Sequence, residues 1–346
     1  MAEQHPIELD ELVLTVVVDN LTDTLSTVDP DVPQTPELIG HLGRHAPHDR
    51  VDGHHGFEPW EHHCVACHGF SVVAEARVGD ERRSVLFDAG PYGDVWVDNA
   101  RRLGVDLSNI EAVFLSHWHW DHSGALPTAV QAIAEARQVA GLDHPVVVDV
   151  HPDRPDQRGN KVGDDTLVLL PPEPSVDQLR EAGGRIETNA DPHPVAGGHF
   201  LGSGAIERRT SYETGLVGHH SVRDGVATPD PLIMDERFLA ATVRGRGITV
   251  LSACSHAGIV NACLAAKELM PDRPVDIVLG GYHLAGRGME ERIEATVDDL
   301  AELIDPAIVA PAHCTGWRAR TALAARFAPG RYGPSSVGST YRLVAP

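Results

Sequence analysis

The chain has 346 residues, of which 42% are apolar, 23% charged and 5% aromatic, so it is long enough to bury a full hydrophobic core. Fifty acidic residues against 28 basic ones give a formal net charge of −22. This charge argues against a nucleic acid or an anionic membrane surface as the main partner, since both are bound through basic patches. The 21 histidines also stand out, because histidine is the commonest metal ligand and acid–base group at neutral pH.

The N-terminal segment and the cysteines bear on the compartment. Glu3, Glu8, Asp10 and Glu11 precede the first apolar run, whereas a secretory signal begins with basic residues and a long apolar core. The sequence has no run of the roughly 18 apolar residues that a membrane span needs. Its five cysteines are an odd number without the spacing of a disulfide framework. We therefore expect a cytoplasmic protein with reduced thiols and no membrane partner.

The first half of the chain predicts a sheet with helices packed on it. Residues 12–18 are β-branched and predict the first strand. Residues 29–63 are rich in proline, glycine, aspartate and histidine and have no periodicity, which predicts an irregular insertion. Regular patterns then predict strands at 70–78, 84–87, 112–115 and 145–150, and helices at 95–103 and 125–139.

The second half begins with a looser stretch, residues 152–235, that holds a few short strands between proline and glycine residues. Regular patterns then return and predict strands at 247–252, 275–279 and 307–310, and helices at 256–269, 290–304 and 316–327. Strands and helices thus mix in both halves. This mixture predicts an α/β protein with helices covering sheets.

A dense group of histidines follows the predicted strand 112–115. His117, His119, Asp121 and His122 fall within six residues, between this buried strand and the next helix. Loops at the carboxyl ends of strands are where α/β proteins place their ligand sites. Imidazole and carboxylate together suit zinc, iron or manganese. The segment therefore predicts a metal site.

This H-x-H-x-D-H string resembles the signature of the metallo-β-lactamase superfamily. Three more segments agree with the superfamily and lie in its order: 85–90 (VLFDAG), 252–258 (SACSHAG) and 311–316 (PAHCTG). The resemblance implies that residues 1–346 form one domain, a four-layer αββα sandwich that holds one or two divalent metal ions, zinc before iron or manganese. It also implies the site residues: His117, His119 and His256 for one metal, Asp121, His122 and His313 for the second, and Asp88 as a support of the metal loop.

One departure from the superfamily concerns the strand that precedes the last histidine. The superfamily usually ends this strand with an aspartate that bridges both metals, but here residues 278–284 read VLGGYHL and contain no acid. Asp276 lies at the wrong end of the strand. Either His283 replaces the aspartate as a ligand, or it faces the substrate as an acid or base. We expect Asp121 and His283 to be the catalytic residues.

The sequence segments around these ligands resemble one branch of the superfamily, named for 7,8-dihydropterin-6-methyl-4-(β-ribofuranosyl)aminobenzene-5′-phosphate synthase. The segments 254–261 (CSHAGIVN), 280–284 (GGYHL) and 203–213 (SGAIERRTSYE) carry this resemblance. Ala205 departs from it, because the branch commonly has glutamate there. The branch's named reaction couples a pterin pyrophosphate to an aminobenzene ribofuranosyl phosphate.

Three hypotheses about function stay open at this point. The first is hydrolysis of a phosphorylated or ester-like small molecule by metal-bound hydroxide, because a metal lowers the pKa of bound water from about 16 to about 7. The second is the pterin-coupling reaction, and the third is a metal-binding sensor without turnover. The complete ligand set favours an enzyme. For substrate binding we expect His68 and Arg208, with Arg208 and the metals attracting an anionic group.

Two weaker signals lie near the N-terminal insertion. The segment 64–68 (CVACH) matches the haem-attachment pattern, and it also allows an auxiliary zinc site with His62 or His63. Further histidines lie within the insertion, for which loop positions near the mouth of the site are the simplest expectation: His41, His45, His48, His54 and His55.

Overall fold

The computed structural model describes residues 5–37, 39–40, 49–56 and 62–346. Within these residues the largest sheet has eight strands in the order β12-β9-β8-β7-β6-β2-β21-β3. Their bounds are β2 (Glu11–Val18), β3 (Gln34–Thr35), β6 (Ser71–Val78), β7 (Glu81–Phe87), β8 (Ile110–Phe114), β9 (Val146–Val150), β12 (Gly184–Thr188) and β21 (Thr340–Val344).

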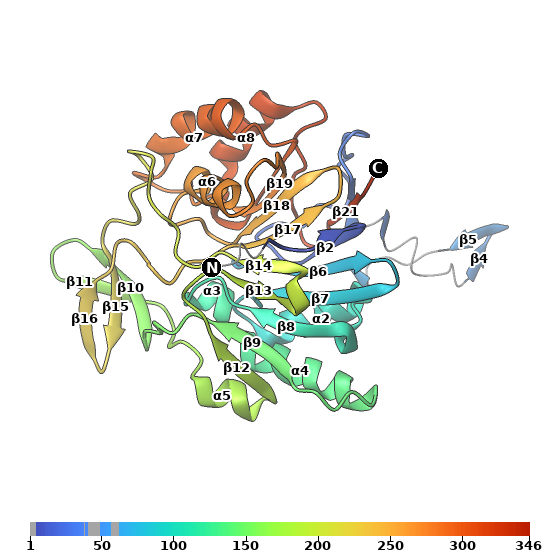
Figure 1. Ribbon diagram of the computed structural model, residues 1–346, viewed down its shortest axis with the longest axis horizontal. Coiled ribbons are helices and arrows are strands. Elements are labelled where there is room, and N and C mark those ends of the chain that lie inside the picture. Colours follow the sequence, from blue (N-terminus) through green and yellow to red (C-terminus); the bar gives the residue numbers. More distant parts are fainter. Residues whose placement is uncertain (1–4, 38, 41–48, 57–61) are drawn as a thin grey trace.

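A second large sheet packs against the first (Figure 1). In the described part of the chain it runs β13-β14-β17-β18-β19-β20, and β1 pairs with β17. Its strands are β1 (Glu8–Leu9), β13 (His193–Val195), β14 (Phe200–Gly202), β17 (Leu239–Val243), β18 (Gly247–Ser252), β19 (Val275–Gly281) and β20 (Ile308–Ala312). The strands β18, β19 and β20 are parallel.

Helices cover the outer face of each sheet, which makes four layers (Figure 1). The first sheet carries α2 (Gly93–Arg102), α4 (Leu126–Val139) and α5 (Val176–Glu181), and the second carries α6 (Ile259–Leu269), α7 (Ile293–Asp299) and α8 (Trp317–Phe327).

Alternating side chains explain why each strand serves two cores. In β7, Val85 and Phe87 point into the core between the sheets, whereas Leu86 points toward the helices on the outside. In β19, Ile277 and Leu279 face the first sheet and Val278 faces the outer helices. Both faces of these strands are therefore buried, and the αββα sandwich implied by the resemblance is confirmed.

A smaller four-stranded sheet stands beside the sandwich, on the left in Figure 1. It consists of β10 (Gln157–Val162), β11 (Thr166–Leu169), β15 (His219–Arg223) and β16 (Val226–Pro229). This sheet lies within residues 152–235, for which the sequence predicts only a few short strands between proline and glycine residues. Its strands are short, and two of them, β11 and β16, are largely exposed, so the apolar alternation that indicates a half-buried strand is weak there.

Other elements differ from the sequence-based expectation. The predicted helix 290–304 is a 3₁₀ turn (Glu290–Arg292), then α7, then a π-helical turn (Leu300–Ile304). The predicted insertion 29–63 contains β3 and a hairpin of β4 (Asp49–Val51) and β5 (His54–Gly56). The hairpin carries two of the insertion histidines, His54 and His55, whereas His41, His45 and His48 lie outside the described residues. Among the described helices, none is long and apolar enough to cross a membrane.

Candidate metal centre

The predicted site residues gather where β8, β18, β19 and β20 end. A cavity of about 430 Å³ opens there. It is lined by Asn20, His68, Pro91, Tyr92, His119, Trp120, Asp121, Asn160, Leu170, Leu216, Cys254, His256, His283, Ala285, His313, Cys314 and Gly316. Segments separated by up to about 300 positions thus meet at one edge of the two sheets, as is usual for α/β ligand sites.

His117, His119 and His256 form one compact group. Nε2 of His117 lies 2.9 Å from Nδ1 of His119, which lies 3.1 Å from Nε2 of His256. All three side chains are buried, and this burial lowers the pKa of each imidazole well below its usual range. The neutral imidazole that results is the form that binds a metal.

The hydrogen bonds around two of these rings fix which nitrogen carries the proton. Ser116 donates its hydroxyl proton to Asp88, so Ser116 Oγ accepts from Nδ1 of His117 at 2.8 Å. The carbonyl of Asp230 accepts from Nδ1 of His219 at 2.7 Å, so Nε2 of neutral His219 accepts from Nε2 of His119 at 2.9 Å. His117 Nε2 and His119 Nδ1 therefore face each other with lone pairs. Two lone pairs at 2.9 Å fit a shared cation, because ligand nitrogens about 2.1 Å from a zinc ion stand roughly 3.4 Å apart.

Asp121, His122 and His313 form a second group, and Cys254 joins it. Their potential ligand atoms all lie within 4.8 Å of one another. Asp121 and His122 belong to the short helix α3 (Trp120–Ser123), and His313 directly follows β20. Nε2 of His313 lies 3.2 Å from the Asp121 carboxylate and has no hydrogen-bond donor. The structure thus brings both implied ligand sets together, and each fits a divalent metal ion.

Asp88 lies directly behind this loop, in the position implied by the resemblance. Its carboxylate accepts hydrogen bonds from the Ser116 amide and hydroxyl, both at 2.7 Å, and from Nδ1 of His122 at 2.8 Å. Burial opposes the charged form of His122, but the Asp121 and Asp88 carboxylates outweigh it and raise the pKa of His122 to about 9. The position beside His122 therefore favours a positive charge.

Two residues that follow β2, Asp19 and Asn20, hold His313 in place. Asp19, which follows β2, accepts the backbone N–H of His313 at 2.8 Å, and the Asn20 amide oxygen accepts from Nδ1 of His313 at 2.8 Å. This bond leaves Nε2 of His313 as the free lone pair that faces Asp121. Sequence reasoning missed both residues, since a single acid and amide after a strand carry no motif.

Buried acids that the sequence did not single out support the other metal segments. Glu236 accepts the backbone N–H groups of His256 and Ala257 at 2.7 and 2.6 Å. Glu213 accepts those of Val260 and Asn261 at 3.0 and 2.9 Å, at the start of α6. Glu213 is the last residue of the segment 203–213. This segment therefore stabilises the N-terminus of α6, the helix that follows His256.

The loop between His117 and His119 has its own anchor. Asp235 accepts the backbone N–H of Trp118 at 2.8 Å and pairs with the guanidinium of Arg158 at 2.6 Å. All three residues are almost fully buried. Arg158 comes from β10, so the small sheet helps to fix the metal loop as well as the cavity wall.

The remaining predicted site residues fall at different distances from the cavity. His283 lines it, and its ring is tilted by 57° against that of His256, with the ring centroids 4.4 Å apart. The ring of His68 is largely exposed at the mouth, with Nε2 3.4 Å from the Asp121 carboxylate. Arg208 does not line the cavity, because its guanidinium donates to the carbonyls of Ile206 and Leu232. The geometry gives Arg208 a structural contact and no direct route to the substrate.

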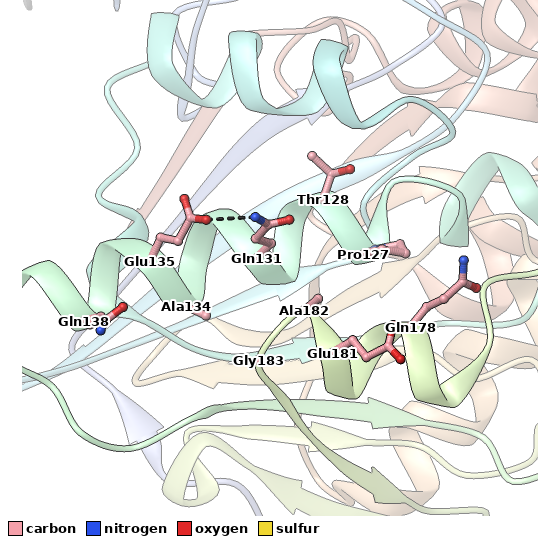
Figure 2. Close-up of a pocket in the computed structure, with 10 residues that line it drawn as sticks. All are labelled: Pro127, Thr128, Gln131, Ala134, Glu135, Gln138, Gln178, Glu181, Ala182 and Gly183. Atoms are coloured by element: carbon pink, nitrogen blue, oxygen red, sulfur yellow. Dashed lines mark hydrogen bonds between the residues drawn. The ribbon is translucent and has the colours of Figure 1, made fainter.

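Two other features lie apart from the histidine groups. A groove with a volume of about 530 Å³ lies between α4 and α5 and is open to solvent. Polar side chains such as Gln131 and Glu135 line it (Figure 2). None of its lining residues belongs to the metal groups. Cys64 and Cys67 likewise belong to none of the potential metal groups among the described residues.

Comparisons with known proteins agree with this geometry. The family model described as the metallo-beta-lactamase superfamily matches residues 65–283. The 7,8-dihydropterin-6-methyl-4-(beta-D-ribofuranosyl)-aminobenzene-5'-phosphate synthase of Methanocaldococcus jannaschii is 26% identical over 255 residues, which cover 73% of this chain and 82% of the relative. The crystal structure of Tm1679, described as a metal-dependent hydrolase of the beta-lactamase superfamily, shares the fold with a TM-score of 0.64 at 23% identity, and the match covers 96% of this chain and 98% of that one.

These matches confirm the resemblance to the synthase branch, and they support an enzyme. The family model covers well over half of the chain, and its matched region contains most of the predicted metal ligands. The chain therefore belongs to the metallo-beta-lactamase superfamily.

Proposed function

We propose that this enzyme is a metal-dependent hydrolase that cleaves a phosphorylated or ester-like small molecule. The observation that carries the proposal is the convergence of buried imidazole nitrogens from His117, His119 and His256 beside the Asp121 carboxylate, at the wall of a cavity. These residues would hold divalent ions, which would supply activation of a water and stabilisation of negative charge on the substrate. Zinc suits these ligands best, with iron and manganese as alternatives.

Two side chains of the cavity have the chemistry to move protons. The Asp121 carboxylate is partly exposed to the cavity, so it can orient the attacking water and accept its proton. His283 lines the same cavity and can donate a proton to the leaving oxygen. His68 contacts the substrate at the mouth, where its ring is exposed.

The lining of the cavity narrows the class of substrate. Among the described residues it contains neither lysine nor arginine, so an anionic group of the substrate would depend on bound metal ions for its charge complement. Tyr92, Trp120, Leu170 and Leu216 supply an apolar wall, which suits an aromatic or aliphatic part of the substrate. We infer a small ester or phosphoester with one ionic group and one apolar group.

A second candidate function is the coupling of a dihydropterin pyrophosphate to an arylamine ribofuranosyl phosphate. The observation that favours it is the 26% identity to a relative with the corresponding synthase name. A pyrophosphate leaving group is stabilised by the same metal positions, and the apolar wall can hold a pterin ring. The two candidates differ in what they release.

The test uses the purified full chain reconstituted with zinc, iron or manganese. Hydrolysis predicts turnover of generic phosphodiester, phosphomonoester, ester or lactone substrates. It also predicts loss of that turnover in His119→Ala, whereas His144→Ala, which changes an exposed histidine outside the cavity, retains it. Coupling predicts pyrophosphate release only when both the pterin pyrophosphate and the arylamine are present.

Each result decides between the candidates. Turnover of a hydrolysable substrate that depends on His119 supports the hydrolase. Two-substrate pyrophosphate release without hydrolysis replaces it by the synthase. Metal-replete protein that is inactive in both assays contradicts both candidates.

A further inference from the structure

Another cavity lies beside the residues that hold His313, and it is separate from the metal cavity. Its volume is about 280 Å³, close to the lower limit of about 300 Å³ for small-molecule sites. Its walls come from residues 21–36, from the loop 334–339 and from Arg320. Six of the lining residues are serines or threonines. The two cavities share no lining residue, so this one offers a polar, hydroxyl-rich site of its own.

Arg320, on α8, is the cationic group of this cavity and is bonded at only one end. Its side chain is 11% exposed. Nη1 donates to the carbonyl of Ser335 at 3.0 Å, whereas Nη2 is buried and has no hydrogen-bond partner among the described residues. A buried donor without an acceptor is costly. Nη2 of Arg320 therefore calls for an acceptor that enters the cavity.

The Asp19 carboxylate does not supply that acceptor, because three other donors already use it. Its Oδ1 accepts the backbone N–H groups of Asn20 and His313 at 2.6 and 2.8 Å, and its Oδ2 accepts the hydroxyl of Ser335 at 2.7 Å. Nη2 of Arg320 lies 3.7 Å from Oδ1, which is outside hydrogen-bond range. Asp19 thus balances part of the charge of Arg320 but leaves its hydrogen-bonding capacity open.

A second donor at the cavity wall follows from the proton positions in the loop 334–339. Oγ of Ser339 accepts from Nε2 of Gln34 at 3.1 Å and from the backbone N–H of Ser336 at 3.3 Å. Both of its lone pairs are then used, so Ser339 donates its own proton to Oγ of Ser336 at 3.2 Å. The hydroxyl proton of Ser336 is left for a ligand. Ser336 and Arg320 both line the cavity, and together they present two donors to an anion.

Gln34 adds an acceptor to the same walls. Its Nε2 donates to the carbonyl of Pro334 at 2.6 Å, which fixes the orientation of the amide. Oε1 of Gln34 is buried and has no hydrogen-bond partner among the described residues. A hydroxyl or amino group beside the anionic group of a ligand satisfies this oxygen.

The mouth of the cavity carries a charge that opposes an anion. Asp23 lies there at an exposed position, and its Oδ1 accepts the N–H groups of Leu25 and Ser26 at 3.1 and 2.9 Å. Its negative charge weakens attraction from a distance, so an anion gains only by direct bonds to the buried donors. The charge of Asp23 also gives a variant whose effect has a definite sign.

We propose that this cavity is a second ligand site, which binds a small molecule through an oxyanion, a carboxylate or phosphate group, held by Arg320 and Ser336. Guanidinium and hydroxyl donors form charge-assisted hydrogen bonds to such a group. A hydroxy acid or a phosphorylated alcohol of small size matches both the donors and the acceptor of Gln34. The inference is independent of the metal centre and of the reaction proposed above, because the two cavities share no lining residue.

Calorimetric titration of the full chain, with and without zinc, tests the site with two probes, orthophosphate and glycolate. The wild type is expected to bind at least one probe with a dissociation constant of about 1 mM or below, equally in both forms. Arg320→Gln is expected to weaken this binding at least about tenfold. Arg318→Gln is the matched control and is expected to change it by less than about twofold. Arg318 lies on the same helix, but it is exposed, pairs with Glu290 and does not line the cavity.

Two variants at the mouth leave the buried hydrogen bonds intact and test the sign of the charge. Asp23→Asn is expected to strengthen binding about two- to fivefold, and Thr27→Glu, at an exposed lining position, to weaken it by a similar factor. The reverse order of these two variants overturns the assignment of an anion. They decide the matter even if Arg320→Gln fails to fold.

A crystal soaked in selenate shows where an oxyanion binds, because selenium gives an anomalous signal. The signal is expected beside Arg320. A signal only at the histidine groups, or probe binding that is unchanged in folded Arg320→Gln, overturns the inference. Failure of both probes to bind at about 10 mM also overturns it. Each of these results leaves the proposed function standing, since that function is tested by turnover and by His119→Ala.

Discussion

His219 is the residue whose replacement tests the tautomer argument most directly. It lies on the small sheet, in β15, and it is not a member of either metal group. Its Nδ1–H donates to the carbonyl of Asp230 at 2.7 Å, and its Nε2 accepts from Nε2 of His119 at 2.9 Å. Burial lowers the pKa of His219, so the ring stays neutral and the acceptor at Nε2 persists near pH 7. His219 thus keeps the lone pair of His119 on Nδ1, toward the metal.

The change His219→Ala removes this acceptor and leaves the buried N–H of His119 without a partner. An unsatisfied buried donor costs about 1–3 kcal/mol, and lost partners of metal-bound histidines weaken metal binding by roughly 10–100-fold. The two figures agree, because each tenfold change in affinity is about 1.4 kcal/mol. We therefore expect zinc to bind the first position about 10–100-fold more weakly.

The assay is competition for zinc between the protein and a chromophoric chelator at pH 7. His220→Ala is the matched control: the neighbouring histidine bonds to the Gly218 carbonyl and does not contact His119. His219→Gln is expected to recover part of the affinity, since its amide oxygen can accept the same proton. An affinity of His219→Ala within about twofold of the wild type refutes the reasoning, provided that circular dichroism shows a folded protein.

Three further predictions concern support of the metal loop, pH dependence and the core. In the wild type the Asp88 carboxylate accepts hydrogen bonds from the Ser116 N–H and the His122 N–H. Asp88→Asn turns an amide N–H₂ group toward one of these two donors. Calorimetric titration is therefore expected to show metal binding about 10–100-fold weaker at the second position. Burial raises the pKa of Glu213 from 4.5 to about 7, although the hydrogen bonds from three donors lower it. Between these two pH values the folded chain holds a proton that the unfolded chain releases. The contribution of Glu213 to stability is therefore full below about pH 4.5 and is lost as the pH rises to about 7. Denaturant unfolding is expected to show a decline of about 3 kcal/mol over that window, which Glu213→Gln abolishes; an unchanged slope contradicts the assignment. Leu14→Ala opens a cavity between the two sheets, where Leu14 is fully buried, and is expected to lower the free energy of unfolding by about 2–5 kcal/mol in urea titrations; a loss below about 1 kcal/mol contradicts the packing described.

The sequence predicts those parts of the molecule in which a local pattern and a chemical requirement coincide. The strand 112–115 and the histidines that follow it belong to one short segment, so both β8 and the loop were predicted closely. The strand 247–252 was predicted with its bounds, because all six of its residues are buried and apolar runs are unambiguous there. The motifs at 85–90 and 311–316 led to Asp88 and His313 because each also stands at a strand end.

The sequence did not reveal the residues that hold the ligands in place. Glu236, Asp235 and Asp19 are single acids in irregular segments, and their roles depend on backbone N–H groups far away in the chain. The strand β21 was not predicted, although it pairs with β2 and lies next to the edge strand β3 of the large sheet. The roles of these acids and of β21 depend on contacts between segments that are distant in the sequence.

The hydrogen bonds from His313 to Asp19 and Asn20 have a consequence for the order in which the chain folds. The bonds join positions 294 and 293 residues apart, and β21 must also insert between β2 and β3. Pairings of such long range form late and slowly, because a large loop has to close before they stabilise anything. A folding chain in which β21 has not yet paired therefore exposes an unfilled sheet edge beside β2. The orientation of His313 is thus fixed late in folding, when residues 19–20 and 313 have come together.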